Sequence, residues 1–403
     1  MAIELQYPLG SYSISNPPSN ETLKGDLNTV QTAVNAQEDQ ITAKLDASSV
    51  DTDPTLSANL DSKIPSQKAI KTYADNISYG MARQAIMNGN FDIWQRGTSV
   101  VIPDVTIKFQ ADRWFDYVDK NGGTLPTLTR SQQLLTPGDI PNAKYFTRLT
   151  TNGAGTSLGV SSSHQYIQKI ENGTSKLCGN GKKVTVSFYA KSDIANKRIC
   201  PTIFQDYGTG GSPSAIEYIK GTPITLTNTW TKYTATFTTN TLVGKTFGTN
   251  GDDSLQLVFH NMWGTTFGNT YVQTSVTAET FRGAGNIDIA QCLLNAGDVA
   301  LPFQPKSFEE ELRACQRYYE EMSYPSQRSN ASPLWGNACP EGIYIPFKVT
   351  KRISPTTAIL TSFTSSHSVS YIPSASGLNC FPPSGGTGSW YLYINSYKAD
   401  AEL

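Results

Sequence analysis

The chain is short of charge. Its 403 residues carry 16% Asp, Glu, Lys and Arg, against about 25% in typical soluble domains, and the formal net charge is −1. Nothing in this balance favours nucleic acid or an anionic membrane as a partner. No run of about 18 apolar residues occurs, so no membrane-spanning helix is expected. The start, MAIELQYPLGSY, lacks the basic and apolar regions of a Sec signal peptide, so we expect a chain made in the cytoplasm.

Residues that bind metals are also few. The three histidines are His164, His260 and His367, and none stands at ligand spacing from another His or Cys. The six cysteines are scattered without a CxxC pair: Cys178, Cys200, Cys292, Cys315, Cys339 and Cys380. We therefore expect free, buried thiols, no metal and no cofactor. Disulfide bonds remain the alternative.

What is present is a β pattern rich in Thr, Ser, Asn and Gly. Inward and outward positions alternate with a period of two in several segments, namely 184–190, 233–238, 255–260 and 287–289. Turns rich in Gly, Asn and Asp separate them. This pattern predicts a mainly β protein with a central β-sandwich, a jelly roll, over residues 88–305.

The N-terminal region has a different period. Residues 1–18 are expected to form an extended arm. From residue 19 to 46, apolar residues repeat at spacings of four and three, which predicts a coiled-coil helix. The seam residues are Leu23, Leu27, Val30, Val34 and Ile41. Self-association would bury this seam, but it does not distinguish a dimer from a trimer, and a helix packed on its own domain is the alternative. Residues 47–87 are expected to be a linker with one short helix.

A second helix, the connector, is predicted at residues 306–322. Ser307 and Glu310 form a capping box, and an apolar stripe follows at spacings of four and three. The stripe consists of Phe308, Leu312, Cys315, Tyr319 and Met322. Residues 323–403 return to a β pattern and are expected to form a small C-terminal β-sandwich, the tip domain.

Several phrases of the sequence resemble one protein family. They are NGNFDIWQRGTS and ADRW within 88–114, PSQKAIKTYADN at 65–76, TNTWTKYTATFT at 227–238, NIDIAQCLLNAGDVALPF at 286–303, FEEELRACQRYYE at 308–320 and the final ADAEL. Together they resemble bacteriophage tail fibre and receptor-binding proteins with a carbohydrate-binding-module-like jelly roll. At residues 292–295 the chain has Cys-Leu-Leu-Asn where that family more often has VQLE, which puts an acidic role there in doubt.

The resemblance implies a function. It implies a homotrimeric virion protein, made in the host cytoplasm, whose N-terminus attaches to tail, baseplate or adaptor proteins. Its outer domains would recognise host surface polysaccharide. The alternative is a purely structural fibre shaft or adaptor, with the receptor binder on another chain. A glycan-cleaving enzyme is the third hypothesis.

We expect no catalytic activity. The sequence has no G-x-S-x-G elbow. Two carboxylate pairs could serve glycan hydrolysis, Asp112 with Asp116 and Asp252 with Asp253. Asp112 fits better as the partner of Arg113 in a buried corner that supports Trp114, and the second pair fits a solvated turn, with a calcium site as its alternative.

Glycan binding needs exposed aromatic rings near polar loops. The candidate residues are Trp263, Trp335, Trp390, Tyr391 and Tyr393. The alternative for each is a place in the core. Trp94, Trp114 and Trp230 are expected to be core residues.

Overall fold

The structure is a computed structural model of the full chain. It describes residues 19–44, 50–51, 64–66, 70, 80–331, 343–365, 370–381 and 390–403. The chain divides into two compact units, Met1–Ser78 and Tyr79–Leu403. The predicted arm at 1–18 and most of the predicted short linker helix lie outside the described residues.

The first unit contains the predicted N-terminal helix, α1, at Asn20–Lys44. Ser19 caps it, because its hydroxyl oxygen accepts a hydrogen bond from the Thr22 N–H at 3.1 Å. Four seam residues, Leu23, Leu27, Val30 and Val34, are 36–67% exposed. The helix is confirmed, and its apolar stripe has no cover within the described residues. Two short parallel strands follow, β1 (Val50–Asp51) and β2 (Ile64–Pro65).

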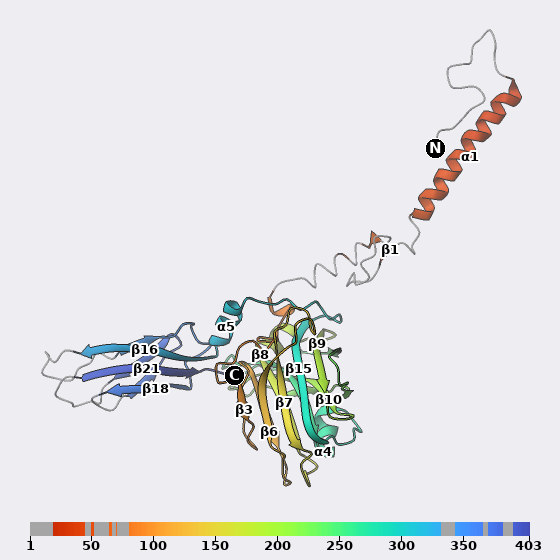
Figure 1. Ribbon diagram of the computed structural model, residues 1–403. Helices are drawn as coiled ribbons and strands as arrows, with labels where there is room; N and C mark the ends of the chain where they lie inside the picture. Colours follow the sequence, from red (N-terminus) through yellow and green to blue (C-terminus); the bar gives the residue numbers. More distant parts are fainter. Residues whose placement is uncertain are drawn as a thin grey trace. The chain divides into compact units, whose positions relative to one another are not determined.

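The second unit begins with a two-sheet β-sandwich, which confirms the predicted mainly β fold (Figure 1). Sheet I has the strand order β11-β10-β14-β8-β5-β4, and β12 also pairs with β10. Its strands are β4 (Lys108–Phe109), β5 (Trp114–Asp119), β8 (Ser163–Glu171), β10 (Arg198–Asp206), β11 (Glu217–Ile219), β12 (Ile224–Thr225) and β14 (Ser254–Trp263). A short helix, α3 (Gly173–Leu177), follows β8.

Sheet II has the order β13-β9-β15-β7-β6-β3. Its strands are β3 (Ser99–Val101), β6 (Leu128–Leu134), β7 (Tyr145–Gly153), β9 (Lys183–Ser192), β13 (Thr231–Thr238) and β15 (Gly283–Ala296). The pairs within sheets I and II are all antiparallel. This architecture suits two faces packed on a shared apolar core.

Aromatic side chains fill the core between the sheets. Phe91 and Trp114 are fully buried, and Trp94 is nearly so. The Trp114 ring stacks on Tyr166 with centroids 4.9 Å apart. These residues are core, as predicted. Five of the six cysteines lie in the described residues, and each is a free, buried thiol.

A buried ion pair also links the two sheets. Arg130 of sheet II donates two hydrogen bonds to Asp116 of sheet I, at 3.0 and 2.6 Å. Burial alone would raise the pKa of Asp116, but Arg130 and His164 together hold that pKa below its usual value. Asp116 is therefore ionised near neutral pH and engaged by Arg130 inside the sandwich.

The connector helix is shorter than predicted. Helix α5 spans Phe308–Gln316, and its capping box of Ser307 and Glu310 is present. Tyr319 and Met322, assigned to the helical stripe, instead lie in strand β16 (Tyr319–Ala331). They pair there with the C-terminal strand, so long-range strand pairing overrides the local helical pattern.

The C-terminal region forms two three-stranded antiparallel sheets. One has the order β16-β21-β18, with β18 at Thr357–Ser365 and β21 at Trp390–Asp400. The other has the order β17-β20-β19, at Ile343–Pro346, Gly377–Phe381 and Ser370–Pro373.

The last residues of the chain return to the sandwich at a cluster that we call the arginine junction. Arg113 forms an ion pair with Glu402, and its guanidinium lies 3.5 Å from the centre of the Tyr318 ring. Arg96 lies 3.5 Å over the Tyr319 ring and pairs with Glu402 at 3.3 Å. The two arginines of the opening segment 88–115 thus fasten the C-terminal strands to sheet I.

Asp112 completes the arginine junction. Gln95 donates to it through both its backbone and its side-chain nitrogen, and Arg96 lies 3.9 Å away. Burial raises the pKa of Asp112 to about 7 in spite of Arg96 and Gln95. The expectation that Asp112 belongs to a buried corner is confirmed. The predicted partner was wrong, however, because Arg113 pairs with Glu402 and not with Asp112.

Candidate glycan-binding groove

Sheet I has a second apolar cluster on the face that points away from the sandwich core. Successive side chains of a strand point to opposite faces, so Trp114 of β5 enters the core while Phe115 points outward. Phe115, Ile167, Phe204 and Val258 form this outer cluster. These four side chains are buried, with Phe109, Ile216 and Tyr271 packed against them, and they form an apolar floor on this face of the sheet.

A hollow of about 520 Å³ lies on the same face and shares Phe204 with this floor, and its volume is within the usual size range of ligand sites. We call it the tyrosine groove. Its lining residues are Tyr117, Asp119, Ser161, Ser163, Gln165, Phe204, Ile216, Tyr218, Gln256, Thr266, Phe267, Thr270 and Tyr271. They come from β5, β8, β10, β11 and β14, from the segments leading into β8 and β11, and from the loop after β14.

Aromatic rings form one wall of the tyrosine groove. The ring of Tyr218, which is 38% exposed, meets those of Phe204 and Tyr271 edge to face, each with centroids 4.7 Å apart. Phe267 lies 4.7 Å from Tyr271. Such packing fixes the ring planes and leaves a rigid, partly exposed aromatic surface.

The loop that carries this wall rests on Trp263. Helix α4 (Thr265–Phe267) and the helical turn η3 (Gly268–Val272) form the loop. A Cβ atom at Gly268 would stand 2.6 Å from the Trp263 ring, so only glycine allows this approach. Trp263 is fully buried, and its indole N–H donates to the Thr277 carbonyl at 3.0 Å.

Amide side chains supply the polar part of the groove. Gln256 donates to Asp206 at 2.9 Å, and Gln165 donates to Ser163 at 3.4 Å. Within the described residues, the side-chain oxygens of both glutamines accept no hydrogen bond. Each glutamine side chain is therefore oriented by one hydrogen bond from its nitrogen, while its oxygen remains available for another. Sites that bind hydroxyl groups have such side chains.

The groove carries little charge. Among its lining residues only Asp119 is charged. Beneath the wall, His260 contacts Thr202 through Nε2 at 2.8 Å, and burial lowers its pKa to about 3, so it is neutral near pH 7. A single lining carboxylate does not supply the pair that glycoside hydrolysis uses.

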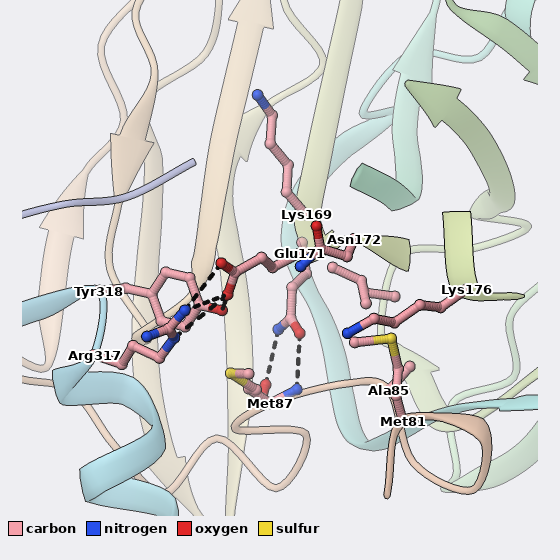
Figure 2. A pocket seen from close by; sticks show the side chains of 11 residues that line it. Met81, Ala85, Met87, Lys169, Glu171, Asn172, Lys176, Arg317 and Tyr318 are labelled. Atoms are coloured by element: carbon pink, nitrogen blue, oxygen red, sulfur yellow. Dashed lines mark hydrogen bonds and ion pairs between the residues drawn. The ribbon is translucent and has the colours of Figure 1, made fainter. Parts of the chain in front are cut away.

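A second hollow, of about 200 Å³, lies where β8 ends (Figure 2). Several of its polar groups bind one another, whereas Lys169, which also lines it, does not. Glu171 accepts bonds from Arg317 at 3.1 Å and Tyr318 at 2.5 Å, and Gln168 exchanges two 2.8 Å bonds with the Met87 backbone. Because Glu171, Arg317, Tyr318 and Gln168 are already satisfied, this part of the hollow suits a structural role.

The predicted glycan-binding residues have different outcomes. The prediction that Trp263 is an exposed platform was wrong, because the loop after β14 covers this residue completely. Trp335 lies outside the described residues. Trp390, Tyr391 and Tyr393 belong to β21, but their side chains lie outside what the structure describes, so they stay predictions. Ile41 of the seam belongs to α1, and its side chain is likewise outside the description.

Sequence reasoning missed the groove residues Tyr218, Tyr271 and Gln165. One signal was present: the alternation of β14 places Gln256, Val258 and His260 on the outer face, and an apolar residue among them hints at a covered surface. Within the described residues, no group of three His, Cys, Asp or Glu side chains could hold a metal ion. No described helix has the length and apolarity to cross a bilayer.

Comparison with known proteins gives one family match. Residues 150–255 match the family model of a carbohydrate binding domain. This segment includes β8, β10 and β11 and thus Gln165, Phe204 and Tyr218 of the groove. The chain therefore contains a carbohydrate-binding-module-like β-sandwich. No curated protein sequence matches it.

The solved structures that this chain matches include three carbohydrate-binding modules or domains. One is described as "CBM4 structure and function", with 18% identity and a TM-score of 0.27 over 52% of this chain and 98% of the other. The xylan-binding CBM22-1 domain of Paenibacillus barcinonensis has 9% identity and a TM-score of 0.27, over 55% and 100%. The N-terminal cellulose-binding domain of a Cellulomonas fimi glucanase has 11% identity and a TM-score of 0.25, over 42% and 90%.

Proposed function

We propose that this chain binds a glycan in the tyrosine groove. The observation that carries the proposal is the exposed Tyr218 ring, fixed by Phe204 and Tyr271, beside two glutamines with unused amide oxygens. The family match over residues 150–255 supports it. The C–H face of a sugar ring would stack on Tyr218, and the hydroxyls would bond to Gln165 and Gln256.

We further propose that the glycan belongs to a bacterial surface and that the chain is a bacteriophage tail fibre. The sequence resemblance supports this setting. The N-terminal arm would attach to tail, baseplate or adaptor proteins of the virion. The chain would recognise the glycan without cleaving it, which an assay for released reducing sugar on host polysaccharide tests.

The exposed stripe of α1 supports self-association, and a homotrimer is the state we propose. One helix of this length with Leu23, Leu27 and Val34 exposed gains stability by burying them against copies of itself. Three copies would multiply a weak affinity for each glycan chain. Light scattering of the full chain checks the state, and a stable monomer contradicts it.

A glycan array probed with the full chain and with Tyr218→Ala tests the binding function. We expect array ligands that the wild type binds and the variant does not. Whole-cell binding with the same pair then connects the array to the host. If neither array nor cells bind the wild type, the structural alternative, a shaft or adaptor that braces the virion, is the better explanation.

A further inference from the structure

A part-buried cation stands directly beside the tyrosine groove. In the pairing of β14 with β8, Gln256 is the partner of Lys169, and in the pairing of β10 with β14, Phe204 is the partner of Gln256. Directly paired residues point to the same face of a sheet. Phe204, Gln256 and Lys169 therefore form one row across the outer face of sheet I, and the first two line the groove.

The Lys169 ammonium group has no dedicated partner. Within the described residues its Nζ makes no hydrogen bond and no ion pair within 4.0 Å, although the side chain is part-buried. Figure 2 shows the side chain extending away from Glu171 and Arg317, which are bonded to each other. Burial lowers the pKa of Lys169, and the charges of Arg113 and Arg352 lower it further. The ammonium group is therefore reachable from solvent and has no protein group bonded to it within the described residues, which leaves it available to an anion.

Arg352 is a second weakly bonded cation, and it is connected to Lys169 through Glu402 and Arg113. Its guanidinium donates only to the backbone carbonyls of Ala401 and Glu402, at 3.4 and 3.5 Å. Arg113 connects the two, since it donates to the Lys169 carbonyl at 2.7 Å and pairs with Glu402. The arginine junction thus places Arg352 near the row that leaves the groove.

The nearby acids are bonded to other groups. Asp206 accepts the Gln256 amide at 2.9 Å, and Asp252 accepts the backbone N–H of Thr209 at 2.7 Å. Both raise the pKa of Lys169 through space, but neither forms an ion pair with it. Their charges reduce the attraction for an anion without supplying the missing contact.

We propose that Lys169 and Arg352 form an anion-binding subsite at the margin of the tyrosine groove, so that the glycan bound there carries acidic substituents. The inference rests on the proposed glycan-binding function and narrows it to a class of ligand. The sugar rings lie over Tyr218 and Gln256, and a carboxylate or a sulfate or phosphate ester of the same chain reaches Lys169.

The test uses the full chain and an array of matched oligosaccharides, each neutral chain beside its uronic-acid form and its sulfated form. We expect the acidic forms to bind about tenfold more tightly, because a hydrogen bond to a charged group is worth more than a neutral one. The two acidic arms distinguish a carboxylate from an ester anion. Added salt is expected to weaken the binding of the acidic forms alone.

Three variants locate the effect. Lys169→Gln is expected to abolish the preference and to leave the affinity for neutral chains unchanged, while Lys169→Arg retains it. Lys232→Gln, the same change at an exposed position of sheet II, is expected to alter nothing. Equal wild-type affinity for neutral and acidic chains, or equal weakening of both by Lys169→Gln, overturns the subsite. Absence of binding to every form overturns the glycan-binding function itself.

Discussion

The opening segment 88–115 and the tyrosine groove use aromatic residues in opposite ways. The opening segment has the densest aromatic pattern and the clearest family motif, yet Phe91 and Trp114 are buried completely. The groove draws single residues from strands and loops far apart in sequence, and Tyr218 remains partly exposed. The motif therefore identifies the sandwich, whereas the site lies on the sheet that the motif helps to build.

The polar groups of the opening segment and of the tyrosine groove also differ in role. In the opening segment, Arg96, Asp112 and Arg113 are engaged by one another, by Gln95 or by the C-terminal strands. In the groove, Gln165 and Gln256 keep an unused amide oxygen. Satisfied polar groups hold a structure together, and oriented but unsatisfied groups are available to a ligand. Four predictions test this contrast, from the largest expected effect to the smallest.

Glu402→Gln tests the arginine junction. The side chains of Arg113 and Glu402 are only 2% and 5% exposed, and removing one partner of a buried pair costs about 3–5 kcal/mol. We expect the free energy of unfolding in urea to fall by that amount, with unchanged glycan affinity. Glu309→Gln, in an exposed pair with Arg313, is the control and should behave as wild type. A loss no larger than the control's contradicts the junction.

Tyr218→Ala tests the aromatic wall. We expect the affinity for an array ligand to fall at least tenfold, about 1.4 kcal/mol, because the stacking surface is lost, with a smaller change in stability. Calorimetric titration measures it. Tyr344→Ala, another exposed tyrosine outside the groove, is the control. If both variants bind equally well, the groove is not the site.

The pH dependence of stability tests Asp112. Its folded pKa of about 7 lies above the ordinary value of 3.8, so the folded state holds more protons between those values and stability falls as pH rises through them. Between about pH 6 and pH 7.5 we expect the wild type to lose about 1 kcal/mol relative to Asp112→Asn. Measuring the difference removes the opposite contribution of His164, whose folded pKa is lowered by burial. If the difference in unfolding free energy between the wild type and Asp112→Asn does not change with pH, the raised pKa is contradicted.

Local patterns predicted the elements of the fold. Alternation located strands such as β9 and β14, and the capping box located the start of α5. The end of α5 was not predictable from the stripe alone. Tyr319 fits a helix by spacing, but its pairing with Asp400, 81 positions later in the numbering, decides its conformation.

The site was harder to predict for the same reason. Outward positions on a strand, such as Gln165 and Tyr117, have the same appearance in sequence whether they face solvent or a groove. The groove exists because five strands align and the loop holding Phe267 and Tyr271 covers one side of them. Trp263 beside a Gly looked like a loop platform, yet it supports that loop from beneath. Only the register of the sheet distinguishes these cases.

Tyr117→Phe tests the difference between core and groove aromatic residues within a single strand. Strand β5 sends Trp114 into the core and Tyr117 to the groove. Removing the Tyr117 hydroxyl deletes one neutral hydrogen bond to a ligand, so we expect about a threefold loss of glycan affinity and unchanged stability. Titration of the same array ligand measures it, with Tyr145→Phe, a tyrosine of sheet II, as control. A loss of stability without a loss of affinity would place Tyr117 with the core, and the division between the two faces of β5 would fail.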